Sequence, residues 1–439
     1  MIIADKPDNS AHLVNSKHSL VMSRRLTLDA LWVMSGQLVA AVAGLFGMRL
    51  LTSVMSPDHF GVMSLSLGII SLVYNIGCAP VTQAAVYFYP TARDQGRDTE
   101  LRNNLLSFLR PILLLVLVVA VSGAVSAIVM GSTKSLLAVV LGLILLCDCI
   151  RAVESTLLNA SRNHKKYSTW LAGEAWLRPL LATSVLLLFG DSALAALVGY
   201  LLASCMMILL LSRSSFAEFS RILYKKNSDP NPDMKSQIWV YALPLIPLGL
   251  VDWTNGVADR YIIGHTLSLA DAGVYAAAYG IASRPFLMLG QVIELAVRPV
   301  YQAAVSAGQR SKANKLLQYW FILVCVAGIC GVLLMNLWRD DLAALLLGVE
   351  YRRGAVLMPW IAAGYVVLSA AQVFQRVCFA HGNSHSVLWI QTSAALVGLA
   401  ATLVGVHYWG LIGASMAVSA TFVVQFAAAF LLSRKNLSV

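Results

Sequence analysis

SLLAVVLGLILLCDCIRAVESTLLNA (residues 135–160) places three charged side chains within a run of helix length that is otherwise mostly apolar. A helix of about 20 apolar residues crosses the hydrocarbon core of a bilayer, and residues 135–147 supply the first half of such a helix. Asp148, Arg151 and Glu154 follow at intervals of three, which puts them on one side of it. Because charge is costly at bilayer depth, these side chains must face protein or water.

The composition of the whole chain agrees with a membrane location. Its 439 residues are 58% hydrophobic and 12% charged, and the mean hydropathy is +0.73. Soluble domains carry roughly 25% charged residues, so a soluble globular protein is excluded. The apolar runs are also far longer than the roughly ten-residue alternating strands of an outer-membrane barrel. We therefore expect an all-α integral membrane protein, with most of its length in membrane-spanning helices.

Twelve apolar runs meet the length requirement, and a basic connection divides them six and six. The expected spans are 30–53, 60–89, 105–130, 135–160, 169–190, 192–212, 238–264, 273–300, 317–337, 356–380, 387–408 and 411–432. The expected divisions are an N-terminal tail (1–28), an N-lobe (29–213), a linker (214–236), a C-lobe (237–433) and a C-terminal tail (434–439).

Basic residues predict the orientation, because Lys and Arg in short loops stay cytoplasmic. They gather on the side of both termini and the linker, whereas the other side has only Lys134, Arg339, Arg352 and Arg353. Both tails and the linker are therefore expected to be cytoplasmic. The net charge of +11 is spread over many short loops, which argues against a nucleic-acid interface.

Motifs for catalysis, metals and cofactors are missing from the sequence. There is no HExxH, GxxxxGK[ST] or GxSxG pattern, so we expect no catalytic residue, no metal site and no cofactor. All seven cysteines fall in predicted spans, and their odd number argues against a disulfide framework. Cys147 and Cys149 are two residues apart and would point to nearly opposite sides of a helix, so they cannot share an ion.

The two halves of the chain resemble each other. FGVMSLSLGIIS (60–71) and AGVYAAAYGIAS (272–283) share glycines, Val, Ile and Ser at a constant offset. With six spans in each half, both halves enter the membrane in the same sense, which makes the repeats parallel. Two six-helix lobes with a cleft between them are the expected architecture.

The segments GMRLLTSVMSPDHFGVMSLSLGI (47–69) and ADRYIIGHTLSLADAGVYAAAYGIA (258–282) resemble the repeated segment of the polysaccharide transporter family, the Wzx-type oligosaccharide flippases of the multidrug/oligosaccharidyl-lipid/polysaccharide exporter superfamily. The resemblance implies a V-shaped, MATE-like fold. It also implies a flippase, not an enzyme, that moves an undecaprenyl-pyrophosphate-linked oligosaccharide from the cytoplasmic to the periplasmic leaflet of a bacterial inner membrane.

The resemblance further implies the biological setting. The cargo would be an O-antigen or exopolysaccharide repeat unit, as in lipopolysaccharide synthesis, and a polysaccharide polymerase and a chain-length regulator would be partners. The chain stops after its twelfth predicted span, whereas related peptidoglycan-precursor flippases typically carry two more helices. That departure favours a surface-polysaccharide unit as cargo.

Charged residues within the spans form the candidate substrate-binding site. Because such residues face water or protein and not lipid, they predict a hydrated cleft. Arg284 has no nearby acid in its own span and is the best candidate to bind a pyrophosphate through paired hydrogen bonds. The other expected cleft cations are Arg260, Arg178, Arg151 and Arg49. The expected cleft or coupling acids are Asp148, Glu154, Glu174, Asp252, Asp259 and Glu294, of which Asp252, Asp259 and Glu294 are candidate proton carriers.

Structural ion pairs are the alternative for several of these groups. Asp148 with Arg151, and Glu174 with Arg178, have local partners that could lock neighbouring helices, and Arg49 could reach the outer interface. Asp148, Arg151 and Glu154 carry one acid in excess, so a cleft-facing cluster needs Arg178 or another cation on a neighbouring helix to balance it, or one of its acids has to be protonated.

Two other functions stay open. A small-molecule exporter of the MATE type would favour an aromatic, acid-lined cleft. A membrane polysaccharide polymerase or ligase would carry a large periplasmic loop with basic residues. The longest such loop here, RDDLAALLLGVEYRRG (339–354), is short but contains Arg352 and Arg353.

Overall fold

The computed structural model describes residues 9–130, 133–211, 232–380 and 384–437, and these ranges contain helices and no strand. The first half consists of α1 (Asn9–Val54), α2 (Pro57–Gly77), α3 (Ala79–Asp94), α4 (Asp98–Met130), α5 (Thr133–Ala160), α6 (His164–Phe189) and α7 (Ala193–Leu211). The second half consists of α9 (Pro232–Ala242), α10 (Leu245–Thr266), α11 (Leu269–Ser306), α12 (Arg310–Leu337), α13 (Arg339–Leu346), the 3₁₀ helix η1 (Val349–Leu357), α14 (Met358–Ala380) and α15 (Ser384–Leu437). Most of the predicted linker lies outside the described residues, and α9 begins inside it.

Eleven helical segments of the described chain are long and apolar enough to cross a bilayer. The last of them, 386–434, is 49 residues long and is interrupted at Gly410, where the backbone leaves helical geometry (φ 57°, ψ −136°). It therefore supplies two crossings, and the predicted twelve spans are confirmed. The chain is thus a multi-pass membrane protein with an all-α fold.

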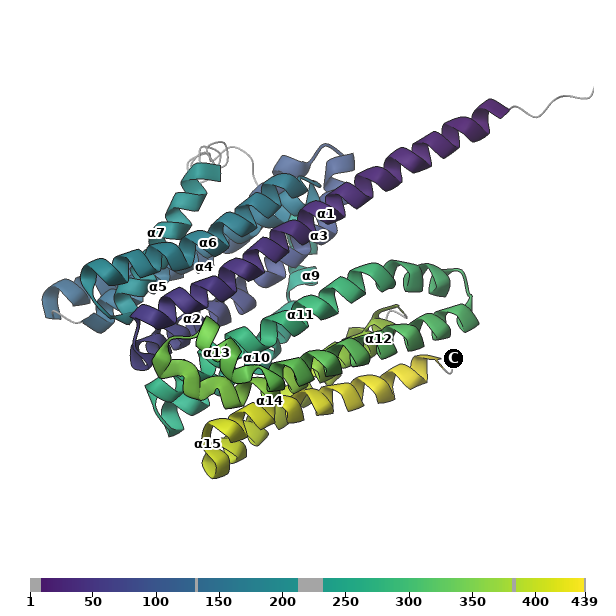
Figure 1. Ribbon diagram of the computed structural model, residues 1–439. Helices are drawn as coiled ribbons and strands as arrows, with labels where there is room; N and C mark the ends of the chain where they lie inside the picture. Colours follow the sequence, from purple (N-terminus) through teal and green to yellow (C-terminus); the bar gives the residue numbers. More distant parts are fainter. Residues whose placement is uncertain (1–8, 131–132, 212–231, 381–383, 438–439) are drawn as a thin grey trace, which may run out of the picture.

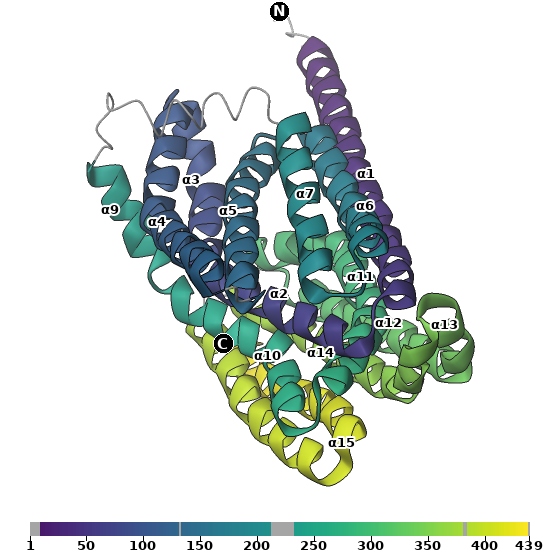
Figure 2. The same ribbon diagram turned by 90° about the vertical axis from the view of Figure 1, so that its left-hand side faces the viewer.

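Two of the predicted spans are broken helices. The second span divides into α2 and α3 at Cys78, just before Pro80. The seventh divides into α9 and α10 at Leu243 and Pro244, a bend visible in Figure 2. Proline lacks a backbone N–H and clashes with the preceding turn, so it interrupts an apolar run without changing its hydropathy.

Helix boundaries repeat between the two halves. α2 and α11 begin 212 residues apart, at Pro57 and Leu269, and the starts of α4 and α12 have the same separation. The turns before α4 and α12 contain Gly96 and Gly308, 212 residues apart, with φ of 66° and 67°. Beyond the α13–η1 insertion the offset becomes 220 residues for the starts of α6 and α15. The internal repeat expected from the sequence is thus present in the backbone.

The helices form two lobes that diverge from a common end (Figure 1). In the N-lobe (α1–α7), α1 packs on α6, α6 on α7 and α4 on α5; in the C-lobe (α9–α15), α14 packs on α15, α12 and α11. α2 lies between the lobes and packs on α10 and α11 (Figure 2). We call the end with the turns α1–α2, α6–α7 and α10–α11 the closed end, and the opposite end, where α1 begins and α15 ends, the terminal end.

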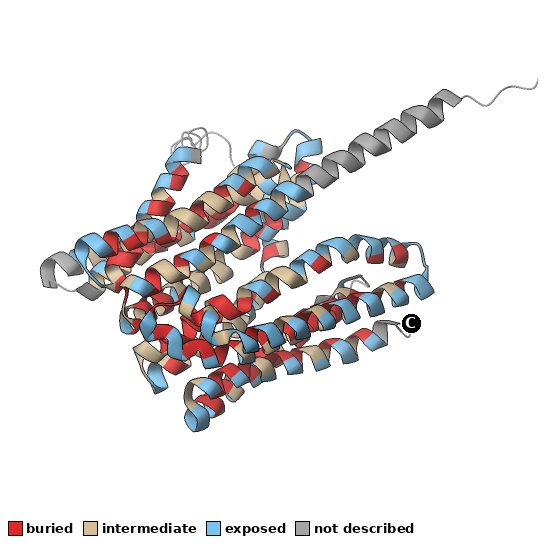
Figure 3. Ribbon diagram, viewed as in Figure 1, coloured by how far each residue is buried: buried red, intermediate tan, exposed pale blue. Residues whose placement is uncertain are grey.

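Backbone contacts join the lobes at the closed end. A Cβ on Gly61 of α2 would lie 2.0 Å from the carbonyl oxygen of Leu269, and a Cβ on Gly273 of α11 would lie 2.1 Å from that of Pro57. The α2 and α11 backbones can approach so closely only because both positions are glycine. Buried residues gather in this region and become sparser toward the terminal end (Figure 3).

The α13–η1 insertion adds hydrogen bonds at the same end. The backbone N–H of Gly348 donates to Thr52 Oγ1 at 2.9 Å, and the Tyr351 hydroxyl donates to the Met55 carbonyl at 2.9 Å. Arg49 Nη1 donates to the carbonyl oxygens of Leu347 and Ala344. The last turn of α1 is therefore attached to the C-lobe.

One expectation about the cysteines is wrong. The structure joins Cys78, at the break between α2 and α3, to Cys149 of α5 by a disulfide. The odd cysteine count did not exclude a single bridge, because the break between α2 and α3 brings Cys78 beside α5. Cys147 is a free thiol, and its sulfur lies 3.9 Å from that of Cys205.

A cavity between the lobes as the candidate functional site

A cavity of about 720 Å³ lies between the two lobes. Its walls come from α1, α2, α6 and α7 of the N-lobe and from α10 and α11 of the C-lobe. Among the residues that the structure describes, its charged lining consists of Arg178, Arg260 and Arg284, with no Asp or Glu. The rest of the wall is mainly apolar, with a few hydroxyl and amide groups. Such a cavity attracts anions.

Arg284 reaches across the cavity from α11 to α1. Its Nη1 lies so near α1 that a Cβ on Gly44 would come within 2.0 Å of it. Gly44 therefore makes room for the guanidinium. In the described part of the chain Arg284 forms no ion pair, so its charge is not offset by a carboxylate within 4.0 Å. Arg284 therefore lines the cavity as a cation with no ion-pair partner among the described residues.

Arg260 enters the cavity from α10. Its guanidinium lies over the ring of Tyr279, 5.1 Å from the centroid, a distance typical of cation–π contact. The neighbouring Asp259 does not line the cavity. Its carboxylate accepts hydrogen bonds from the Tyr275 hydroxyl at 2.6 Å and from the Arg260 backbone N–H at 2.8 Å. Asp259 is thus engaged inside the C-lobe.

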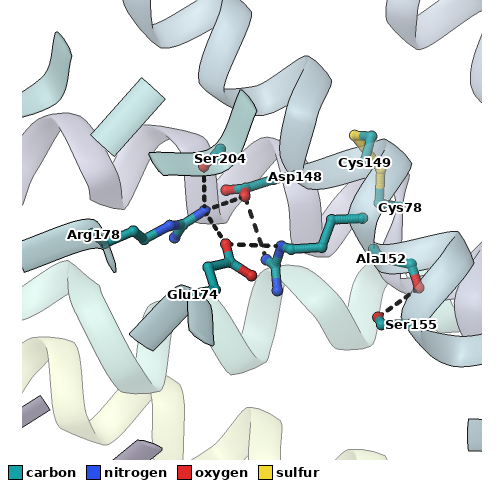
Figure 4. A network of polar contacts seen from close by, with 9 residues as sticks. Cys78, Asp148, Cys149, Ala152, Ser155, Glu174, Arg178 and Ser204 are labelled. Atoms are coloured by element: carbon teal, nitrogen blue, oxygen red, sulfur yellow. Dashed lines mark hydrogen bonds and ion pairs between the residues drawn. A yellow bond between two sulfur atoms is a disulfide. The ribbon is translucent and has the colours of Figure 1, made fainter. Parts of the chain in front are cut away.

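Arg178 lines the cavity but is also bound to acids in the N-lobe (Figure 4). It forms ion pairs with Asp148 and with Glu174, the latter at 2.7 Å, and donates to Ser204 Oγ at 3.1 Å. Arg151 pairs with the same two acids, at 3.4 Å to Asp148 and 3.2 Å to Glu174. We call Asp148, Arg151, Glu174 and Arg178 the N-lobe ion network. Its formal charge is zero.

The remaining predicted site residues lie away from the cavity. Glu154 does not join Asp148 and Arg151 in the expected cluster but pairs with Arg102 of α4. Glu294 pairs with Arg376 at 2.8 Å, and Arg49 binds carbonyl groups of the C-lobe at the closed end. Asp252 is exposed on α10 and forms no ion pair within the described residues.

Some cavity residues carried no signal in the sequence. Tyr200 of α7 lines the cavity, and the Arg178 guanidinium carbon lies 5.8 Å from its ring centroid. Gln37 of α1 also lines it. A single tyrosine or glutamine in an apolar span is common, so only the packing of the lobes identifies these two.

Comparisons with known proteins agree with this architecture. A family model described as "Polysaccharide biosynthesis protein" matches residues 26–305, and a model described as "MatE" matches residues 244–404. No curated protein sequence gives a significant match.

Several solved structures share the fold. "Lipid II flippase MurJ, inward closed conformation" has a TM-score of 0.70 at 13% identity, covering 93% of this chain and 89% of that one. An inward-facing multidrug resistance MATE family transporter of the MOP superfamily has a TM-score of 0.68 at 15% identity, covering 92% and 94%. A MOP superfamily transporter from Pyrococcus furiosus, described as having a binding pocket of reverse polarity, has a TM-score of 0.59 at 15% identity, covering 94% and 95%. The expected MATE-like fold is confirmed.

Proposed function

The chain belongs to the polysaccharide biosynthesis protein family, and from that premise we propose that it is a flippase for a lipid-linked oligosaccharide. The cargo we propose is an undecaprenyl-pyrophosphate-linked repeat unit of O-antigen or exopolysaccharide type. It moves from the cytoplasmic to the periplasmic leaflet of a bacterial inner membrane. Both termini are cytoplasmic in this proposal, because the basic loops lie on their side.

The cationic lining of the cavity is the observation that carries the proposal. Arg178, Arg260 and Arg284 face a space without Asp or Glu among the described residues. A pyrophosphate is a polyanion, and guanidinium groups bind phosphate oxygens through paired, charge-assisted hydrogen bonds. A cationic drug would be repelled by the same lining, so the cavity favours the flippase over a MATE-type drug exporter.

The arrangement of the lobes suits alternating access. Backbone contacts between Gly61 and Gly273 seal the closed end, while the lobes diverge toward the terminal end (Figure 1). With cytoplasmic termini, the cavity faces the leaflet from which the cargo is taken. Release on the other side then requires the lobes to part at the closed end and meet at the terminal end.

The loop of residues 339–354, whose basic residues left a polymerase or ligase as an alternative function, makes structural contacts through those residues. Residues 339–354 form α13 and part of η1. Arg353 pairs with Asp271 at 2.9 Å, and Arg352 Nη2 donates to the Ala344 carbonyl at 3.4 Å. These two basic residues tie the loop to itself and to α11, which supports a transporter over a polymerase or ligase.

Reconstitution tests the proposal directly. Proteoliposomes are loaded with a lipid-linked oligosaccharide labelled on its sugar, and exposure of the sugar at the far leaflet is followed with a membrane-impermeant lectin or glycosidase. We expect protein-dependent exposure under a proton gradient, a sodium gradient or no gradient. Absence of exposure under all three conditions, with efflux of a cationic dye instead, would replace the flippase with the drug exporter.

A further inference from the structure

Arg178 belongs to two sites at once. It is part of the cavity wall, and it holds both acids of the N-lobe ion network. Asp148 and Glu174 are buried, with 8% and 5% of their surface exposed. Arg260 and Arg284 differ in this respect, since neither forms an ion pair in the described part of the chain.

The groups around the network determine whether another cation could take the place of Arg178. From α5 come Asp148 and Arg151, from α6 Glu174, and from α7 the Ser204 hydroxyl (Figure 4). Among the described residues, further titratable or charged side chains near these groups are Tyr74 of α2, the thiols Cys147 of α5 and Cys205 of α7, Tyr200 of α7, and Arg284 beside Tyr200. None of these can replace Arg178, because the neutral groups carry no positive charge and Arg284 forms no ion pair with either acid.

Charge balance therefore depends on where the Arg178 guanidinium lies. With Arg178 in place, two acids face two arginines. If an anion in the cavity draws Arg178 away, two buried carboxylates remain with Arg151 alone. A buried carboxylate without a partner is strongly unfavourable as an anion and takes up a proton when water can deliver one.

We propose that Asp148 and Glu174 form a proton site that fills when Arg178 leaves them to bind an anionic ligand in the cavity. The inference rests on the proposed function, because the ligand is the diphosphate of the proposed cargo. On binding, the guanidinium moves from the acids to the phosphate oxygens, and one proton from water bonds to Asp148 or Glu174. On release, Arg178 returns to the acids and the proton leaves. No bond other than that to the proton is made or broken.

Binding of a diphosphate with measurement of protons tests this site. Purified full-length protein in detergent is titrated with geranylgeranyl diphosphate at pH 8, where most of the phosphate charge is already present. Calorimetry in two buffers of different ionisation enthalpy then gives the protons exchanged. We expect uptake of about one proton per ligand bound by the wild type. Binding without proton uptake would overturn the inference and leave the flippase proposal intact. No binding at all would contradict both the inference and the flippase proposal, because both require a diphosphate to bind in the cavity.

Two neutralised glutamates provide the matched comparison. In Glu174→Gln the network has one acid left, so Arg178 can leave and Arg151 still balances Asp148. We expect this variant to bind the diphosphate more tightly, with proton uptake close to zero. Glu154→Gln removes the acid that pairs with Arg102 outside the network, and this variant should behave as the wild type. Equal proton uptake in Glu174→Gln and wild type would overturn the inference.

A ligand-free measurement makes the test independent of the cargo. Arg178→Ala imitates the state in which the guanidinium has left, so one acid should be protonated in the folded protein. Its thermal stability should therefore fall as the pH rises from 6 to 8, because the folded state then has to give up that proton. Arg178→Ala combined with Glu174→Gln should lose this pH dependence. A pH dependence that persists in the double variant would contradict the assignment to these acids.

Discussion

Both walls of the cavity contain arginine, but the walls differ in whether that arginine is paired with acids. On the N-lobe wall, Arg178 is bound by two acids and a hydroxyl inside the lobe. On the C-lobe wall, Arg284 has no ion pair within the described residues and lies against the glycine backbone of α1. A compensated arginine has to leave its acids before it can bind a ligand, whereas an uncompensated one presents its charge to a ligand directly. The two walls should therefore respond to substitution in opposite ways.

Arg284→Ala should have the largest effect on transport and little effect on folding. A charge-assisted hydrogen bond contributes about 1.5–3 kcal/mol, so translocation should fall roughly 10- to 100-fold. Arg284→Lys should recover part of it, since the charge remains but the planar fork is lost. Arg298→Ala, on the same helix but paired with Glu294, is the matched control and should transport normally. Wild-type transport by Arg284→Ala would remove the contrast between the walls.

Arg151→Ala should show the opposite behaviour on the N-lobe wall. It leaves two buried acids with one cation, a loss of about 3–5 kcal/mol in stability if water does not reach them. Expression and detergent stability should therefore drop, and Asp148→Asn in the same chain should restore them by restoring the charge balance. Stability is measured by thermal unfolding, with transport measured separately. Normal stability of Arg151→Ala would mean that water already screens the network.

Gly61→Ala should disturb the junction of the two walls. The added Cβ would overlap the Leu269 carbonyl oxygen at 2.0 Å, which destabilises the closed-end contact by about 1–3 kcal/mol. Spin labels on either side of the closed end should report a longer distance, and transport should fall several-fold. Gly256→Ala on α10, where a new Cβ has nothing within 4 Å, is the control. An unchanged distance in Gly61→Ala would show that this contact does not set the conformation.

Asp191→Asn should have the smallest effect. Burial opposes ionisation, but hydrogen bonds from Ser56 and His59 outweigh it and hold the pKa of Asp191 below its ordinary value. Because the pKa is lowered in the folded state, ionised Asp191 stabilises the fold at pH values above its unfolded-state pKa of about 3.9. This stabilisation is lost as the pH falls through the pKa that Asp191 has in the folded state. Because Asp191 is exposed, the loss should be about 0.5 kcal/mol or less. The stability of wild type and Asp191→Asn against unfolding is measured between pH 3 and 6. The same pH dependence in both proteins would contradict the prediction.

The sequence predicted the features that depend on local pattern. Apolar length identified the twelve spans, and matching letters at a fixed offset identified the repeat. Spacing also identified the acid partners of Arg178 and Arg151, because residues three or four apart share a helix face. Arg284 was singled out by the same spacing argument, since no acid lies three or four residues from it in its own span.

Charge balance also suggested the pairing of Arg178 with the Asp148 cluster across two helices, but the other features that depend on packing between helices could not be predicted. Glu154 shares a face with Asp148 in the sequence, yet it pairs with Arg102 because α4 packs on α5. Arg49 reaches carbonyl groups of an inserted helix that hydropathy does not place. The disulfide of Cys78 depends on the break between α2 and α3. In each case the partner is remote along the chain, and one sequence contains no record of it.

Gly61 and Gly273 occupy equivalent positions in the two repeats, and each lies against the other's helix. A residue can touch its own counterpart only on a rotation axis, so the pseudo-twofold axis of the molecule passes between them. Two separate half-length chains related by that axis would make the same contact as a parallel homodimer. In such a dimer a side chain larger than glycine would clash twice, whereas in the fused chain each glycine can be exchanged alone. The present contact thus has the geometry of a symmetric subunit interface, built within a single chain.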